Sequence, residues 1–357
     1  MKTKKLLEEM VRQDASDLFC RAGSPPRLRV DGHITALGEE ALTIDDVVKA
    51  VEEITTPEQR EKLKNNLDID FALFSQELDR RLRISIFMQR NWPAFVIRNI
   101  RNTIANFQEL NLPAEVLKKL CLETRGLVLL TGSTGSGKST AIASMLEYIN
   151  SNTKKHILTI EEPIEFTFKD KGSIINQREL GLDVLSYATA LRAFTLQSPD
   201  VIYIANIRDP ETMAAALTAA ETGVLVLSTL HTINAAQSVE RITNFFPPHQ
   251  HHQVHMQLAT LLKGVISLRL VPLKGQSGRI PAYEIMLLTP TISRLIREGN
   301  VVEIPKFIEE GSIFGMQSFT QSLVKLSEAG KISEEEAMAF SDNKDEFILS
   351  LKGIRKV

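Results

Sequence analysis

The sequence predicts an α/β protein with two domains. Its 357 residues exceed the roughly 100 to 200 residues of one typical domain. A glycine-rich segment, Gly132 to Ser139, lies between a short apolar run and an amphipathic helix. Further short apolar runs alternate with helical stretches behind it, the pattern of a parallel sheet covered by helices.

Residues 1 to 101 predict an α+β domain. Leu6, Leu7, Met10 and Val11 recur at helical spacing, and an alternating strand and a hairpin turning at Asp31-Gly32 follow. Two more helices start at N-capping threonines, the second with proline at its first position, and three strands come after them. The capping threonines are Thr43 and Thr56, and the strands are expected at 67–74, 81–90 and 94–100.

Four arginines lie on the last two of these strands. They are Arg81, Arg83, Arg98 and Arg101. Charged residues on a sheet face are most often simply solvated, so the residues alone assign them no role.

Residues 102–113 form a linker of mixed polarity without a sustained period, ending in a proline. The second domain then spans 114–357. It begins with a short helix and a strand, Gly126 to Thr131, that is branched, apolar and bounded by glycine, as expected for a strand buried on both faces.

The segment Gly132 to Ser139 fits G-x-x-x-x-G-K-[ST], a phosphate-binding loop. Its glycines let backbone N–H groups face oxyanions, Lys138 reaches the β- and γ-phosphates, and Ser139 binds Mg²⁺. An accidental glycine-rich turn is the alternative, which the flanking strand and helix disfavour. The predicted ATP-binding residues are Gly132, Ser133, Thr134, Gly135, Ser136, Gly137, Lys138, Ser139 and Thr140.

Carboxylates follow the next strand, His156 to Ile160. Glu161, Glu162 and Glu165 come at its carboxyl end, where the Mg²⁺ and the attacking water of a P-loop enzyme lie. A surface cluster of acids is the alternative interpretation.

Two further buried strands are predicted at 200–204 and 225–230. The first leads into Ala205-Asn206, at the place where a P-loop enzyme carries its Walker B carboxylate. The second ends at His231, which is placed to sense a γ-phosphate, although a single histidine is more often structural. Alternating parallel strands and helices make this a RecA-like domain.

The C-terminal part is mainly helical. Helices are expected at 291–297 and 317–329, strands at 265–271 and 280–287, and a last docked helix from the spacing of Ile348, Leu351 and Ile354. His251, His252 and His255 share one side of a helix, and a solvated face is favoured over a metal site because no cysteine or acid completes the set.

Composition restricts the partners and the compartment. The net charge of −2 leaves no overall basic field for nucleic acid. Cys20 and Cys121 are far apart, which indicates a reducing compartment without structural zinc. No apolar stretch approaches the roughly 20 residues of a membrane span and no signal-peptide core appears, so a cytoplasmic protein is expected.

Several segments together resemble the type II/IV secretion ATPases, and within them the PilT/PilU type IV pilus retraction motors. They are the phosphate loop, Thr159 to Glu165, Ala220 to Gly223, Thr229 to Thr232, Ser16 to Phe19, Leu295 to Glu298 and Gly315 to Phe319. A second set favours the PilU branch: Gln89 to Asn91, Phe245 to Gln253, Arg269 to Pro272 and Glu328 to Ile332.

The resemblance implies a cytoplasmic, bacterial ring hexamer that binds ATP and Mg²⁺ between an N-terminal PAS-like domain and the RecA-like domain. It implies that Arg83 and Arg98 reach the nucleotide, that Glu161 orients or deprotonates the water, that Glu162 replaces a metal-binding aspartate beside Ser139, and that His231 is the His-box residue. The implied partners are a PilT-like retraction ATPase and the inner-membrane pilus platform protein, which hold the motor at the inner face of that membrane.

The sequence departs from the family at Asn206, which replaces the Walker B glutamate, and also at Leu196 and Val224. Losing a charged hydrogen bond of roughly 1.5 to 3 kcal/mol slows hydrolysis by about tenfold to 150-fold.

Two functions therefore remain: an ATP-hydrolysing retraction motor for twitching motility, and a weakly hydrolysing accessory ring that assists an active PilT-like motor. DNA translocation is disfavoured by the near-neutral charge and the lack of a basic, aromatic-lined groove.

Overall fold

The computed structural model describes residues 2–30, 32–100, 103–194 and 196–353. The chain divides into two compact units, Met1–Thr103 with Glu165–Thr167, and Ile104–Ile164 with Phe168–Val357. Of the residues named above, Asp31, Arg101 and Ile354 lie outside the described part.

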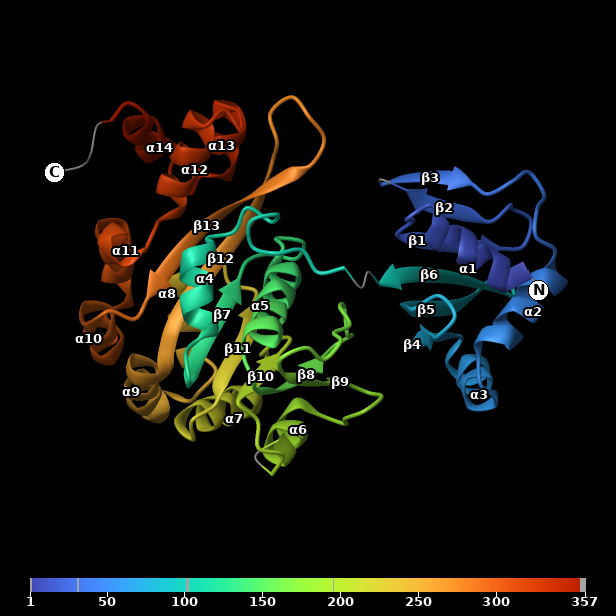
Figure 1. Cartoon of the computed structure of the whole chain (residues 1–357), viewed down its shortest axis with the longest axis horizontal. Coiled ribbons are helices and arrows are strands. Elements are labelled where there is room, and N and C mark those ends of the chain that lie inside the picture. Colours follow the sequence, from blue (N-terminus) through green and yellow to red (C-terminus); the bar gives the residue numbers. More distant parts are fainter. Residues whose placement is uncertain (1, 31, 101–102, 195, 354–357) are drawn as a thin grey trace. The chain divides into compact units, whose positions relative to one another are not determined.

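The N-terminal unit is one antiparallel sheet with helices on one face (Figure 1). The strand order is β3-β2-β1-β6-β5-β4. The strands are β1 (Asp17–Arg21), β2 (Arg27–Val30), β3 (His33–Ala36), β4 (Asp68–Ser75), β5 (Arg80–Gln89) and β6 (Trp92–Ile100), and the helices are α1 (Lys2–Arg12), α2 (Ile44–Ile54) and α3 (Pro57–Asn66).

The helices of this unit begin where the caps predict. Thr43 and Thr56 each accept a hydrogen bond from the backbone three residues on and complete a capping box, and Pro57 is the first residue of α3. Alternate strand residues such as Leu82, Ile84 and Ile86 point into the core beneath the helices. The other face therefore carries the intervening polar residues, including Arg83.

The second unit contains a seven-stranded sheet of order β13-β12-β7-β11-β10-β8-β9. All neighbours are parallel except the pair of β12 and β13. The strands are β7 (Gly126–Thr131), β8 (His156–Glu161), β9 (Ile174–Glu179), β10 (Val201–Ile204), β11 (Leu225–Leu230), β12 (Leu262–Pro272) and β13 (Arg279–Leu287).

Helices cover both faces of this sheet (Figure 1). α4 (Ala114–Cys121) and α5 (Lys138–Asn152) pack on one face. The other face is covered by α6 (Tyr187–Phe194), α7 (Pro210–Glu221), α8 (Ala235–Thr243), α9 (His251–Leu261), α10 (Pro290–Glu298) and α11 (Ile304–Glu310). The strands at its centre are buried throughout, which confirms the predicted α/β class.

A third cluster of helices packs against the distal parts of β12 and β13. These helices are α12 (Phe319–Glu328), α13 (Glu334–Phe340) and α14 (Lys344–Leu351). The buried side chain of Phe347 anchors α14, so the predicted last helix docks, but not through the predicted spacing: Ile348 is exposed and Leu351 is only partly buried.

The edge strand β9 is absent from the sequence-based assignment. Its burial alternates imperfectly, and Asn176, Gln177 and Arg178 interrupt any apolar run. Pairing with β8 holds it in place, from His156 opposite Ile174 to Glu161 opposite Glu179. Local composition does not encode such a strand, because its backbone partner lies elsewhere in the chain.

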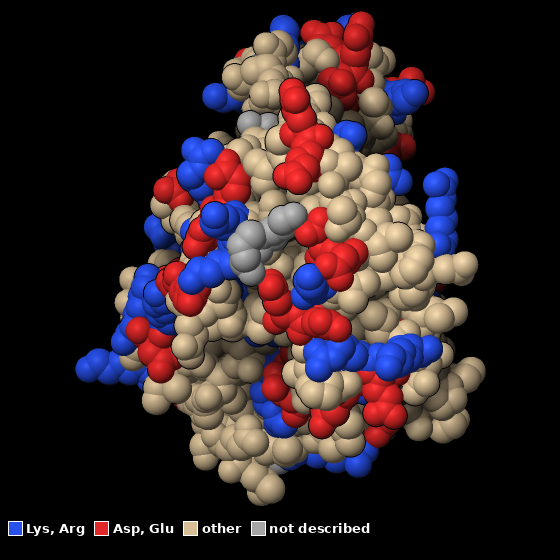
Figure 2. Space-filling view, turned by 90° about the vertical axis from the view of Figure 1, so that its right-hand side faces the viewer, with Lys and Arg blue, Asp and Glu red and all other residues tan. Residues whose placement is uncertain are grey.

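Positive and negative side chains are interspersed on the face drawn in Figure 2. None of the described helices is long and apolar enough to cross a membrane.

Candidate active site

The phosphate loop joins the end of β7 to the start of α5. Gly132, Gly135 and Gly137 all adopt positive φ, at 141°, 78° and 95°. A Cβ atom on Gly132 would lie 2.5 Å from both the Leu268 carbonyl oxygen and the Ser136 Oγ. Only glycine fits this point, where the backbone turns tightly enough to curl its N–H groups toward a ligand.

Lys138, the first residue of α5, lies folded over this loop. Its Nζ donates to the carbonyl oxygens of Gly132 at 2.7 Å and Ser133 at 2.8 Å. The residue is 8% exposed, so the ammonium group is fixed at the loop rather than in solvent. Ser139 and Thr140 follow half-buried in the first turn of α5, at the positive end of the helix dipole.

The loop also holds an unsatisfied polar group. The Ser136 Oγ is buried and has no hydrogen-bond partner among the described residues. A buried hydroxyl without a partner is costly, by about 1 to 3 kcal/mol. Together with the glycine curl and Lys138, it forms a site whose chemistry fits a phosphate group.

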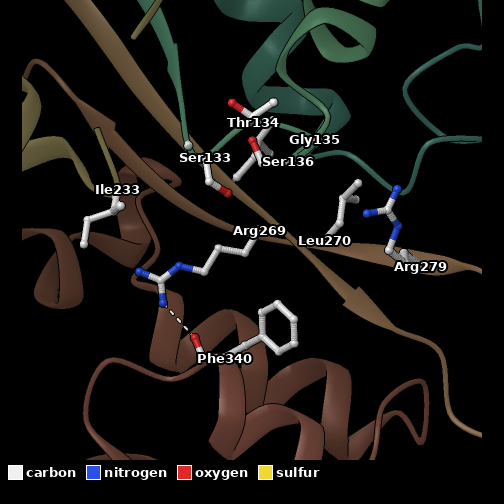
Figure 3. A pocket seen from close by; sticks show the side chains of 11 residues that line it. Ser133, Thr134, Gly135, Ser136, Ile233, Arg269, Leu270, Arg279 and Phe340 are labelled. Carbon is white, nitrogen blue, oxygen red and sulfur yellow. Dashed lines mark hydrogen bonds between the residues drawn. The ribbon is translucent and has the colours of Figure 1, made fainter. Parts of the chain in front are cut away.

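A pocket of about 350 Å³ opens beside the loop (Figure 3). Its walls combine the loop with apolar and cationic side chains: Ile233, Leu268, Arg269, Leu270, Arg279 and Phe340. Arg269 crosses the pocket wall, donates to the Phe340 carbonyl oxygen at 2.7 Å and pairs with Asp342. The pocket thus lies between the phosphate loop and the C-terminal helices.

The parallel strands bring the predicted polar residues to the edge where the loop begins. In the registers, Leu230 of β11 lies opposite Thr131, and Ile204 of β10 lies opposite Ile160. Glu161, Asn206 and His231 each follow one of these positions within two residues. The loop, the acid, the amide and the imidazole therefore share the carboxyl edge of the sheet.

Glu161 is held firmly at this edge. Its Oε1 accepts from the Thr159 hydroxyl at 2.7 Å and from the Gln177 amide at 2.9 Å, and the residue is 5% exposed. Gln177 comes from β9, so its contact was not predictable without that strand. These donors hold the carboxylate in one orientation at the edge of the sheet.

Glu162 faces a cation instead. Its Oε2 lies 3.3 Å from the Arg208 guanidinium, and both side chains are substantially exposed. Burial of the nearby Tyr187, together with the Glu162 charge, raises the pKa of that phenol.

Asn206 and His231 contact one another. The Nδ2 of Asn206 lies 3.1 Å from the Nε2 of His231. Burial, and the charges of Lys138 and Arg208, lower the pKa of His231 below its ordinary value of 6.5. The imidazole is therefore neutral at pH 7 and can accept this hydrogen bond, while the buried Asn206 Oδ1 has no partner among the described residues.

In the N-terminal unit, Arg83 and Arg98 are directly opposite on β5 and β6. Arg98 donates from Nε to Asp17 at 2.9 Å, and Arg83 donates to Asp70 at 3.0 Å. Asp17 is 4% exposed and also pairs with Arg29 at 3.2 Å. The neighbouring positive charges of Arg83 and Arg98 repel each other, and the negative charges of Asp70 and Asp17 offset this repulsion. Sequence reasoning missed both acids, because they meet the arginines only across strands.

The histidines of α9 do not assemble a metal site. His251 Nε2 bonds the Phe246 carbonyl oxygen at 2.9 Å. No group of three or more potential metal-binding His, Cys, Asp or Glu side chains occurs in the described ranges.

A phosphate loop between a buried strand and a helix, on a parallel sheet with an acid, an amide and a histidine at the same edge, defines a RecA-like P-loop nucleotide-binding protein. The comparison with known families agrees with this class and narrows it. The chain belongs to the type II/IV secretion system protein family, which matches residues 2–339.

Its relatives include pilus motors. The chain is 41% identical to the type IV pilus ATPase PilU of Pseudomonas aeruginosa over 352 residues, covering 99% of this chain and 92% of the relative. It is also 41% identical to the retraction ATPase PilT of that organism over 332 residues, 93% of this chain and 96% of the relative.

The crystal structure of the pilus retraction motor PilT with bound ADP is similar in fold. The TM-score is 0.88 at 41% identity, covering 96% of this chain and 97% of that one. The Legionella pneumophila ATPase DotB shares the fold, with a TM-score of 0.78 at 24% identity.

Proposed function

We propose that this protein is an ATP-driven motor of a type IV pilus, which hydrolyses ATP to ADP and phosphate during pilus retraction. The observation that carries the proposal is the convergence of Lys138, Glu161 and the Asn206–His231 pair at one edge of the sheet. The relatives named PilU and PilT support the pilus as the machine that the motor serves.

Each residue at the edge has a distinct task in this proposal. The loop N–H groups, Ser136 and Lys138 bind the triphosphate, with Lys138 exchanging its loop carbonyls for phosphate oxygens. Ser139, with Glu162, would hold Mg²⁺, which would supply positive charge to the phosphates of the nucleotide.

Glu161 orients or deprotonates the attacking water. The hydrogen bonds that its Oε1 accepts from Thr159 and Gln177 hold the carboxylate at the edge of the sheet where the water would lie. His231, kept neutral, senses the γ-phosphate through the segment that follows β11. In the assembled ring, Arg83 and Arg98 supply guanidinium groups to the transferring phosphoryl group.

We further propose a homo-hexamer that works with a PilT-like ATPase and the inner-membrane platform protein of the pilus. These partners would hold the protein at the cytoplasmic face of the inner membrane. Light scattering with ATP present tests the ring: a hexamer supports it, and a monomer alone contradicts it.

A second function is favoured by Asn206. An amide can accept a hydrogen bond from a water bound to Mg²⁺, but it lacks the charge of a carboxylate. The protein could then bind ATP, hydrolyse it weakly and assist an active PilT-like ring.

A steady-state ATPase assay of the purified protein, alone and with a PilT-like partner, separates the two. Lys138→Ala is the matched control for contaminating activity. Turnover of the protein alone above that control supports a motor in its own right. Turnover that appears only with the partner supports the accessory ring, and no Lys138-dependent turnover under either condition overturns both.

A further inference from the structure

A row of buried polar side chains crosses three strands beneath the phosphate loop. Thr131 of β7, Ser267 of β12 and Glu284 of β13 lie directly opposite one another in register. Thr131 and Ser267 are 0% exposed and Glu284 is 8% exposed. Burying a carboxylate away from water costs free energy unless hydrogen bonds compensate for its lost hydration.

Hydrogen bonding and strand register connect the row. The Thr131 hydroxyl donates to the Ser267 Oγ at 2.9 Å, and Ser267 lies directly opposite Glu284 on the neighbouring strand. Thr131 immediately precedes Gly132, so one end of the row is the start of the phosphate loop.

The other end of the row reaches the segment that carries His231. Glu284 Oε1 accepts from the backbone N–H of Ala235 at 2.8 Å. Ala235 is the first residue of α8, whose N-cap is Asn234. Only three residues separate Ala235 from His231, so this contact fixes where the connection between β11 and α8 lies relative to the sheet.

We propose that Glu284 is a positioning residue of the nucleotide site, which holds the His231 segment against the strand that enters the phosphate loop. The inference rests on the proposed function, because it assumes that His231 acts on bound nucleotide. Glu284 itself does not touch the nucleotide. It acts on the His231 segment through the Ala235 amide, and its register opposite Ser267, which lies opposite Thr131, anchors it beside β7.

Arg269 lies near the row of buried polar side chains and also contacts the C-terminal helices. Arg269, two residues after Ser267 on β12, lies close enough to Glu284 to act on its charge. Arg269 also stacks over the Phe319 ring at 3.8 Å and pairs with Asp342. The hydrogen bonds of Arg269 to Phe340 and Asp342 therefore serve α13 and the connection after it, whereas Glu284 accepts from the Ala235 amide.

The test is a double-mutant cycle on kcat and KM for ATP, with the hexamer intact. Glu284→Ala and His231→Ala should each lower kcat, by about tenfold, and change KM little. The double variant should be no slower than His231→Ala alone, because Glu284 acts only through that segment. Glu284→Gln, which retains an acceptor for the Ala235 amide, should restore most of kcat. Tyr283→Phe, on the same strand, is the control and should leave kcat unchanged.

A merely structural role would not produce this pattern. If Glu284→Ala has the kcat of the parent, or if the two losses multiply in the double variant, the positioning role is wrong. If His231→Ala alone leaves kcat unchanged, it is the proposed role of His231 that fails, and the inference fails with it. Should Glu284→Ala not fold, Glu284→Asp serves in the same cycle, because the shorter side chain keeps the charge but withdraws it from the Ala235 amide.

Discussion

The side-chain amide of Asn206 lies 3.1 Å from the Nε2 atom of His231 and donates to it. The contact depends on a hydrogen that the glutamate of the family pattern lacks, since an ionised carboxylate has no hydrogen to donate. The departure at position 206 therefore also sets the hydrogen bonding of His231, and the two residues should be studied as a pair.

Asn206→Glu should raise turnover by about tenfold to 150-fold, the effect of one charged contact of roughly 1.5 to 3 kcal/mol. The physical reason is that Mg²⁺ relies on one or two carboxylates beside the phosphates. The measurement is kcat under saturating Mg-ATP. Asn206→Gln, which keeps the amide, is the control, and an unchanged rate in Asn206→Glu would refute a limiting defect at this position.

Glu161→Gln should abolish most hydrolysis and leave ATP binding intact. The amide preserves the size of the side chain but cannot accept a proton, and a general base typically contributes about 100-fold to 10,000-fold. Rates and calorimetric affinities of the same preparation check both parts. Full activity in Glu161→Gln removes this residue from the catalytic role.

Arg83→Ala and Arg98→Ala should each impair hydrolysis more than nucleotide binding, because a guanidinium group contributes most where charge develops on the phosphoryl group. Arg27→Ala, an exposed arginine on β2 of the same sheet, is the matched control. The assignment fails if both variants hydrolyse ATP like the parent.

Glu284 should make stability depend on pH. Burial raises its pKa from 4.5 to about 7. Between these values the folded protein keeps a proton that the unfolded chain has lost, so the contribution of Glu284 to stability falls as pH rises from about 4.5 to 7. Arg269 and Asp342 are the charged groups that act on this carboxylate, in opposite directions.

The Glu284→Gln variant carries no such proton. Its melting temperature should therefore rise relative to that of the parent as pH rises from 5 to 8. The corresponding change in the difference between their free energies of unfolding is up to about 3 kcal/mol. Thermal unfolding of both proteins across this range measures the difference. A constant gap would show that Glu284 does not titrate in this window.

The fold class was predictable because its signals are local. Each signal depends only on residues close to it in the sequence. These signals are the glycine-rich loop, the apolar runs before and after it, and the capping threonines Thr43 and Thr56. The parallel order of these strands then brings Glu161, Asn206 and His231 to one edge, as the placement of each after a strand indicated. Their roles remain predictions.

The partners of these residues were not predictable from the sequence. Gln177 reaches Glu161 from an edge strand with no apolar pattern, Asp17 meets Arg98 across 81 residues, and Glu284 bonds Ala235 across 49. Each contact depends on strand register, which a single sequence does not reveal. In each of these three contacts a buried acid, Glu161, Asp17 or Glu284, bonds a residue that is distant in sequence.

Calorimetric titration of Mg-ATP into the folded parent and into Lys138→Ala tests the central claim most directly. The backbone of the loop cannot neutralise a triphosphate by itself, and the Lys138 ammonium supplies a point charge at the β/γ bridge. The account predicts binding to the parent and loss of measurable binding in Lys138→Ala. Equal affinity in a Lys138→Ala protein shown to be folded by its thermal transition would contradict it.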